Sequence, residues 1–395
     1  MKRICLLVAL VALWVSHAPA RAAPEAQAAL GWKAQINGLV EGKKIGISVR
    51  EADRFLYRHA DTKRRTPASN EKLLLSMALL DRVGPDLRIH TIARAGNVTP
   101  EGVVPGNLWL LGRGDPHVGP GKLGLLAARI EEAGVTRVKG SVRGAISYFA
   151  HDWWAPGWKP YFPAEEIALP SALTFRGNVA GGKHISDPER RAARELTQQL
   201  RARGVKVAGK AGAGQPPGGL EEVGEVSSPP LIVLLRNMLR PSRNFYGEVL
   251  GKRLGVERQG PPGTISKGAA AIRNWAAGLG VRLVTYDCSG LSYRNGVSPR
   301  GMVRLLGKVE GLDWGPELME ALPSPGQGTL DDRLAGVPVK AKTGTLTRIS
   351  ALSGWVYLQE TGTWAEFSIM SRGMATTAAK HLEDRIVRLI WKHAH

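Results

Sequence analysis

The stretch from Pro67 to Leu75, PASNEKLLL, is the feature that most constrains how this chain can fold. An apolar run with almost no helix breakers follows it, so we expect a helix from Ser69 to about Arg82 that ends at Gly84. Lys72 would then stand one turn after Ser69, on the same face. A hydroxyl beside an amine at the positive end of a helix dipole can serve as an activated nucleophile. The alternative is that Ser69 is only an N-cap, a position that favours serine.

The two ends of the chain share a pattern of long elements that the middle lacks. Glycine and proline are frequent between residues 87 and 225, and the predicted elements there are short. The ends instead predict a strand hairpin, an apolar helix, two further strands and a closing amphipathic helix, at residues 44–50 and 54–58, 231–239, 337–343 and 350–358, and 376–392.

This arrangement predicts an α+β fold in which an antiparallel sheet flanked by helices is built from two distant segments. A smaller α/β domain is inserted between the two segments. The predicted divisions are a signal peptide, the first segment, the inserted domain and the second segment, at residues 1–22, 24–86, 87–225 and 226–395.

The N-terminus has the three parts of a secretory signal peptide. Lys2 and Arg3 precede an apolar run over residues 4–15, which is too short to span a bilayer comfortably, and small residues suited to cleavage follow. We therefore expect a periplasmic or otherwise exported protein that is soluble after cleavage, with an uncleaved anchor as the alternative. Cleavage would leave Cys288 as the single cysteine, so no internal disulfide can form.

The net charge of the chain is +20, which suggests an anionic partner. Loss of residues 1–22 removes three basic residues and no acid, and lowers the charge to +17. The basic residues are scattered, and no zinc-finger spacing or RNA-binding aromatic motif is present, so nucleic acid is not the expected partner. We expect electrostatic association with an anionic envelope surface, and plain solubility is the alternative.

Two later motifs strengthen the interpretation of Ser69 as a nucleophile. Ser242-Arg243-Asn244 follows a predicted helix and places a hydroxyl and an amide on an exposed loop. Residues 342–345, Lys-Thr-Gly-Thr, end a predicted strand, where glycine leaves room for a ligand to approach the backbone. The order Ser-x-x-Lys, Ser-x-Asn and Lys-Thr-Gly is the signature of penicillin-interacting serine enzymes.

With these motifs the chain resembles the class C low-molecular-mass penicillin-binding proteins, the D-alanyl-D-alanine carboxypeptidase/endopeptidase family. The resemblance implies a penicillin-binding, transpeptidase-like fold and an exported serine DD-peptidase that cleaves D-Ala-D-Ala bonds of peptidoglycan stem peptides, with cross-link endopeptidase cleavage as a further option. It also implies covalent inhibition by β-lactam antibiotics. Other matching stretches are residues 108–116, 156–158, 170–173, 287–295, 328–333 and 342–354.

The resemblance implies an acyl-enzyme mechanism that needs neither a metal nor a cofactor. Ser69 would attack the peptide carbonyl, and a neutral Lys72 would take its proton. Ser242, with Lys342 behind it, would pass a proton to the leaving amine, while Asn244 orients the lysine and the substrate.

The same resemblance places the terminal carboxylate of the substrate on the Lys-Thr-Gly-Thr strand. The expected substrate-binding residues are Thr343, Gly344 and Thr345, together with the ammonium of Lys342. The backbone N–H groups of Ser69 and Thr345 would form the oxyanion hole.

Four positions depart from the pattern of the family. Ala145 stands where relatives often carry an acid, and Tyr293 replaces an arginine. Cys288 replaces a glycine, and Arg243 adds a cation inside the Ser-x-Asn motif. The first two positions are associated in the family with recognition of the third stem residue. These departures and the positive charge make a non-catalytic peptidoglycan-binding protein one alternative. A β-lactamase-like hydrolase is the other, and it is disfavoured because no residue corresponds clearly to a dedicated deacylating carboxylate.

Overall fold

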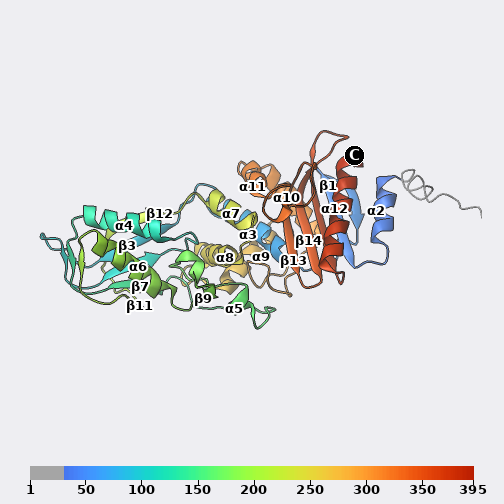
Figure 1. Cartoon of the computed structure of the whole chain (residues 1–395). Coiled ribbons are helices and arrows are strands. Elements are labelled where there is room, and N and C mark those ends of the chain that lie inside the picture. Colours follow the sequence, from blue (N-terminus) through green and yellow to red (C-terminus); the bar gives the residue numbers. More distant parts are fainter. Residues whose placement is uncertain (1–30) are drawn as a thin grey trace, which may run out of the picture. The chain divides into compact units, whose positions relative to one another are not determined.

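The computed structural model describes residues 31–395 in two units (Figure 1). The first unit ends at Glu41 and contains one described helix, α2 (Trp32–Val40). The second unit comprises residues 42–395 and holds every residue of the predicted site. The predicted signal peptide, residues 1–22, lies outside the described residues.

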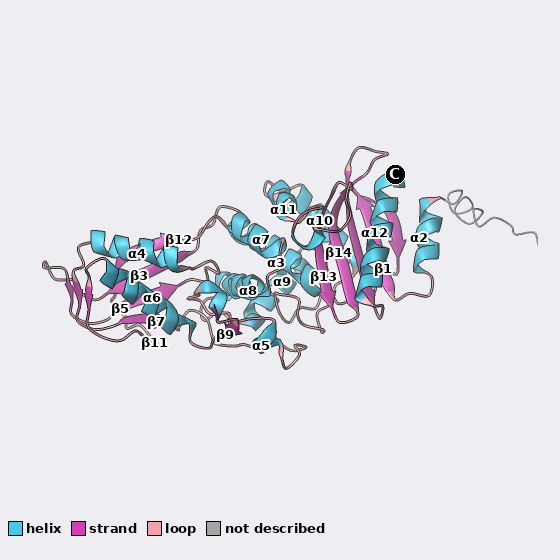
Figure 2. Cartoon of the chain, in the orientation of Figure 1, coloured by secondary structure: helices cyan, strands magenta, loops and turns pink. Residues whose placement is uncertain are grey.

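A five-stranded antiparallel sheet joins the two ends of the chain (Figure 2). Its order is β13-β14-β15-β1-β2, and Ile45 of the early strand β1 pairs with Ser371 of the late strand β15. The strands are β1 (Ile45–Glu51), β2 (Arg54–His59), β13 (Val339–Leu346), β14 (Ile349–Tyr357) and β15 (Trp364–Arg372). The predicted antiparallel sheet from distant segments is therefore confirmed. The sequence reading missed β15.

Helices cover this sheet. Strand β14 is for that reason buried at almost every position rather than at alternate ones. Helix α12 packs on β14, and α10 packs on β1 and β15. A second group of helices shares one apolar core with the sheet. The helices of this region are α3 (Glu71–Val83), α7 (Leu231–Leu239), α8 (Asn244–Gln259), α9 (Ile265–Gly278), α10 (Pro299–Glu310), α11 (Gly315–Ala321) and α12 (Thr376–His393).

A second five-stranded sheet, of mixed direction, lies in the middle of the sequence. Its order is β11-β7-β5-β3-β12, and helices α4 and α6 pack on it around a core drawn only from residues 93–226. The elements are β3 (His90–Ala95), β5 (Leu108–Gly112), α4 (Pro120–Glu132), β7 (Val142–Ala145), α6 (Pro188–Ala202), β11 (Gly212–Gly214) and β12 (Glu221–Ser227). A smaller α/β region is thus present, and its boundaries at residues 87 and 225 stay a prediction.

The remaining elements of this region are short. A parallel three-stranded sheet, a two-stranded hairpin and two helical turns are formed by β4 (Val103–Val104), β6 (Arg137–Val138), β10 (Lys206–Val207), β8 (Val179–Ala180), β9 (Lys183–His184), α5 (Phe162–Glu165) and the 3-10 turn η2 (Arg176–Asn178). Another 3-10 turn, η3 (Gly328–Leu330), precedes β13. Among residues 31–395, no helix is long and apolar enough to cross a membrane.

The helix expected to begin at Ser69 begins two residues later. Ser69 lies in the 3-10 turn η1 (Ala68–Asn70), and α3 starts at Glu71. The backbone of Ala68 has φ 49°, in the left-handed region, so the right-handed helix cannot extend back through it. The 3-10 turn therefore places Ser69 just before the N-terminus of α3 rather than within its first regular turn.

Candidate active site

Ser69 lines a cavity of about 500 Å³ in which distant segments of the chain meet. Asn244 enters it from the first turn of α8, and Thr345 from the end of β13. Glu166, just after α5, and Tyr293, in the loop before α10, also line it, and its other polar residues are Tyr161, Thr347, Arg348 and Thr376. The sequence motifs therefore share one cavity with residues from the middle of the chain.

Two glycines hold the backbone of Ser69 in place. A Cβ on Gly344 of β13 would lie 2.5 Å from the carbonyl oxygen of Pro67, so β13 can approach η1 only with glycine there. On the other side, a Cβ on Gly290, whose φ is 84°, would collide with the carbonyl of Ala68. We expected Gly344 to make room for a ligand; the space is occupied by the turn that carries the serine.

Lys72 is the centre of the polar contacts beneath Ser69. Its Nζ lies 3.0 Å from Ser69 Oγ, 2.8 Å from Asn244 Oδ1 and 2.5 Å from the backbone oxygen of Ser289. The side chain is fully buried. A neutral amine has two hydrogens and one lone pair, and the two carbonyl oxygens accept the two hydrogens. The lone pair is then directed at the serine hydroxyl, which is the geometry of a general base.

Burial favours the neutral form of this amine. It lowers the pKa of Lys72 to about 8, against the opposing charges of Asp287 and Glu248, which raise it. We expected the cation Lys342 to be a second cause of a low pKa. The carboxylates are instead the larger electrostatic influence on Lys72, so desolvation alone accounts for the direction of the shift.

Buried carboxyl groups form a layer around Lys72 that sequence reasoning missed. Glu248 Oε1 accepts hydrogen bonds from the backbone N–H groups of Cys288 and Ser289, at 2.8 and 2.7 Å. Burial, and then the charge of Asp287, raises the pKa of Glu248 to about 8. Through these two hydrogen bonds Glu248 fixes the segment whose carbonyl holds Lys72.

Asp287 organises the rest of that segment. Its carboxylate accepts hydrogen bonds from the indole N–H of Trp158 at 2.6 Å and the amide of Asn295 at 2.6 Å. It also accepts the backbone N–H groups of Gly290 and Ser292, at 3.1 and 2.8 Å. The Asp-x-Ser-Gly stretch was noted in the sequence only as a point of resemblance. Its structural role is to shape the loop against Ser69.

Lys342 is fully buried on the side of β13 that faces η1. Its Nζ donates to the backbone oxygen of Thr343 at 2.8 Å. Burial, and then the charge of Lys72, lowers the pKa of Lys342 well below its ordinary value. Thr343 is also buried, with its hydroxyl 2.7 Å from that of Thr329, whereas Thr345 is exposed in the cavity.

The Ser-x-Asn motif reaches the site mainly through its asparagine. Within residues 31–395, the hydroxyl of Ser242 makes no hydrogen bond to Ser69, Lys72 or Lys342, and its backbone has φ 61°. Arg243 does not line the Ser69 cavity. Its guanidinium carbon instead lies 5.3 Å from the centroid of the Tyr246 ring. The expected cation thus faces a neighbouring cavity of about 480 Å³.

Ala145 and Tyr293, the two departures associated with recognition of the third stem residue, lie in different places. Ala145 is buried at the end of β7 and does not line the Ser69 cavity. Tyr293 does line it, and its ring carries the ammonium of Lys159 5.0 Å from the centroid. The acidic residue that lines this cavity is Glu166, whose backbone oxygen accepts a hydrogen bond from Asn244 Nδ2 at 3.2 Å. No motif marked Glu166, because only folding brings it beside α8.

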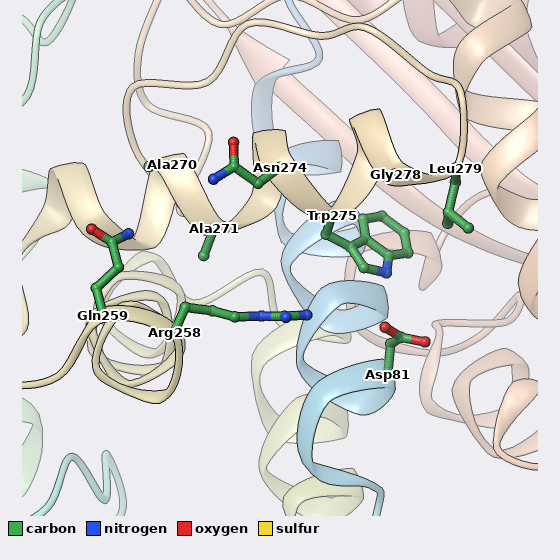
Figure 3. A pocket seen from close by; sticks show the side chains of 9 residues that line it. All are labelled: Asp81, Arg258, Gln259, Ala270, Ala271, Asn274, Trp275, Gly278 and Leu279. Atoms are coloured by element: carbon green, nitrogen blue, oxygen red, sulfur yellow. The ribbon is translucent and has the colours of Figure 1, made fainter.

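Another cavity, of about 550 Å³, lies between α3, α8 and α9, where Arg258 extends towards Asp81 and Trp275 (Figure 3). Asp81 is roughly 18 Å further along the helix axis than Ser69. None of its lining residues has a hydroxyl, thiol or amine that could serve as a nucleophile. In the described part of the chain, no group of three or more His, Cys, Asp or Glu side chains could hold a metal ion.

Comparison with known proteins gives a family match that covers most of the chain. The D-Ala-D-Ala carboxypeptidase 3 (S13) family matches residues 27–179 and 172–393. A D-alanyl-D-alanine carboxypeptidase of Actinomadura sp. (strain R39) is 27% identical over 443 residues, which cover 89% of this chain and 82% of the relative. A carboxypeptidase of Mycobacterium tuberculosis is 27% identical over 369 residues, covering 85% and 77%.

The fold is also similar to that of a solved structure. Penicillin binding protein 4 of Haemophilus influenzae superposes with a TM-score of 0.81 and 20% identity, covering 90% of this chain and 99% of that protein. At this identity the likeness concerns the fold alone. It confirms the predicted fold class, and the family match confirms the resemblance read from the motifs.

Proposed function

Because this chain belongs to the D-Ala-D-Ala carboxypeptidase 3 (S13) family, it is a peptidase of peptidoglycan, and we propose that Ser69 is its nucleophile. The proposed reaction is hydrolysis of the D-Ala-D-Ala bond of stem peptides through a serine ester. The observation that carries it is the contact of Ser69 Oγ with a buried Lys72 whose two other polar contacts are carbonyl oxygens.

In the first step, Ser69 Oγ bonds to the carbonyl carbon of the penultimate D-alanine, and its proton moves to the neutral Lys72 Nζ. The tetrahedral intermediate collapses, the C–N bond breaks, and the departing D-alanine takes a proton at its amine. Water then attacks the ester, and the second product leaves with a free carboxylate. General base catalysis of this kind contributes roughly 10²- to 10⁴-fold.

We assign the remaining motif residues by position. Asn244 orients Lys72, which the 2.8 Å contact supports. Ser242, two residues earlier, would deliver the proton to the leaving amine once substrate fills the cavity. The hydroxyl of the exposed Thr345 would bind the terminal carboxylate, with the Nζ of Lys342 behind it as a hydrogen-bond donor.

Thr343 and Gly344 would contribute to this carboxylate site through the strand itself. Gly344 lets β13 lie against η1, so the strand and Ser69 have a fixed spacing. Thr343 anchors the strand to Thr329 at 2.7 Å. The backbone N–H groups of Ser69 and Thr345, which line one cavity, would form the oxyanion hole.

The test is covalent labelling combined with product analysis. Fluorescent penicillin should form a stable adduct with the wild-type chain and none with Ser69→Ala. Mass spectrometry should detect D-alanine released from purified muropeptides by the wild type alone. A folded wild-type protein that neither acylates nor releases D-alanine would overturn the proposal, and would favour a wall-binding role without catalysis.

A β-lactamase-like activity is a second candidate, because the Glu166 carboxylate lines the cavity of Ser69. A carboxylate in that position could activate the deacylating water. Multiple turnovers of a chromogenic cephalosporin, lost in Glu166→Gln, would support it. A single slow burst would show that β-lactams act only as covalent inhibitors.

We also propose that the protein works outside the cytoplasm, where its substrate lies. The N-terminal signal pattern supports export. The positive charge would favour retention at an anionic envelope surface. Fractionation of cells that express the full chain, before and after a salt wash, tests both points.

A further inference from the structure

A cavity of about 780 Å³ outside the Ser69 site has an unusual charge. Seven of its sixteen lining residues are lysine or arginine, and none is aspartate or glutamate. The whole chain has 54 basic residues among 395, so the cavity is far richer in cations than the protein around it. Its exposed cations include Lys44, Lys63, Arg64, Arg294 and Arg372.

These cations are not neutralised within the protein. Across residues 31–395, none of the five side chains just named forms an ion pair with a carboxylate. The carboxylate of Asp61 is close to them in the sequence, but it is buried and accepts two hydrogen bonds from Arg300, at 2.9 and 3.0 Å. Positive charge from these five side chains therefore accumulates in the cavity without a carboxylate partner among the described residues.

The backbone around the cavity is fixed by hydrogen bonds from several elements. Arg65 forms an antiparallel bridge with Val297, with N–O distances of 2.9 and 3.0 Å. The N–H of Arg372 donates to the backbone oxygen of Lys44 at 2.9 Å, where β15 meets the start of β1. These contacts fix the backbone at Lys44, Arg65 and Arg372, which reduces the entropy lost when their side chains bind a ligand.

One guanidinium in the wall is incompletely paired. Arg65 Nη2 donates to the backbone oxygen of Ile45 at 2.7 Å, but its Nε is buried and has no partner among the described residues. Burial lowers the pKa of Arg65. Burial, and then the charge of Arg65, also lowers the pKa of His59, which lines the same cavity. An anion in the cavity would stabilise the charge of Arg65 and the protonated form of His59.

The size of the cavity indicates more than a single ion. A volume of about 780 Å³ lies within the range of sites that enclose whole small molecules. Thr66, Asn295 and Ser371 also line the cavity, but their polar side-chain groups hydrogen-bond within the protein, so the exposed lysines and arginines are the groups that can bind a ligand. Arginine matches the planar array of phosphate oxygens, and the number of cations exceeds what one carboxylate requires.

We propose that this cavity binds the phosphate group of a phosphorylated saccharide, with Arg64 and Arg372 among the side chains that hold it. The cavity borders the Ser69 site. Tyr293 and Arg348 line the Ser69 cavity, and the residue that follows each of them, Arg294 or Ile349, lines this one. A phosphorylated glycan held there would keep the peptidase on the polymer that surrounds its substrate. The binding site itself does not depend on the assignment of Ser69.

Calorimetry at low salt with three probes tests the proposal. N-acetylglucosamine 6-phosphate should bind at least tenfold more tightly than inorganic phosphate, and N-acetylglucosamine should not bind. Arg64→Ala/Arg372→Ala should weaken binding of the sugar phosphate at least tenfold, because it removes two unpaired cations. Acylation by penicillin should stay unchanged in this variant, which separates the outcome from that of the Ser69 test.

The matched control is Arg137→Ala/Lys206→Ala, which removes two exposed cations from the parallel sheet far along the chain. We expect less than a twofold change there. Equal loss of binding in the control would show diffuse attraction to a basic protein, and would overturn the proposal. Inorganic phosphate binding as tightly as the sugar phosphate would do the same, since the site would then hold an adventitious ion only.

A second readout reports directly on the cavity. The imidazole of His59, assigned in the proton spectrum with His59→Gln, should show a raised pKa when the sugar phosphate is added, because the anion offsets the charge of Arg65. The same titration in Arg64→Ala/Arg372→Ala should show a much smaller rise. A pKa of His59 that the ligand does not move would place binding elsewhere and refute the assignment.

Discussion

Acylation of Ser69 should accelerate as the pH rises through the pKa of Lys72. With a pKa of about 8 in the folded protein, the neutral fraction of the amine is roughly one tenth at pH 7 and nine tenths at pH 9. If the neutral amine is the base, the second-order rate constant for acylation should rise about ninefold between these values. The Ser69–Lys72 contact of 3.0 Å is the geometry on which this depends.

The same ionisation should appear in the stability of the fold. Below pH 8 the amine carries a proton in both the folded and unfolded chains, and burying that charge costs about 3 kcal/mol, because the pKa falls from 10.5 to about 8. The penalty is relieved as the pH rises from 8 towards 10.5. Urea denaturation at pH 7 and pH 10 should show this gain in the wild type and not in Lys72→Met.

The rate of acylation of Ser69 is measured by stopped-flow mixing with a fluorescent penicillin between pH 6.5 and 9. Lys72→Arg is the control, because a guanidinium keeps its proton in this range; its acylation should be at least 100-fold slower and independent of pH. Circular dichroism establishes that the variant is folded. A wild-type rate that is constant or falls between pH 7 and 9 would refute the neutral-lysine mechanism.

Three further changes test the surroundings of Lys72. Asn244→Ala removes the 2.8 Å contact to Lys72, and penicillin acylation should slow about 100-fold with little change in melting temperature. Glu248→Ala leaves two buried N–H groups unpaired and should cost about 3 kcal/mol in urea denaturation, whereas Glu248→Gln keeps an acceptor and should cost about 1 kcal/mol or less. Gly344→Ala places a Cβ 2.5 Å from the oxygen of Pro67; it should reduce acylation at least tenfold, and wild-type rates in this variant would contradict the close packing of β13 on η1.

Local patterns in the sequence were sufficient for elements whose own residues specify them. Helix α7 has the predicted limits, Leu231 and Leu239, because its apolar side chains recur with helical spacing. Helix α6 was missed, although its buried Ala192, Leu196 and Leu200 recur every four residues, because charged and polar residues dominate the stretch. Strand β15 was missed as well, since a strand buried on both faces lacks the alternation that marks a half-exposed one.

The chemical groups of the site can be identified from the residues alone: a serine and a lysine one helical turn apart, an asparagine, and a Lys-Thr-Gly-Thr strand in the order of a known family. How these groups act depends on the folded chain. The carbonyl of Ser289, the buried carboxyl of Glu248 and the approach of Glu166 come from outside the motifs. The pKa of Lys72 depends on its burial and on charges summed over those segments. Such a sum depends on distances in space, and no local pattern of residues encodes them.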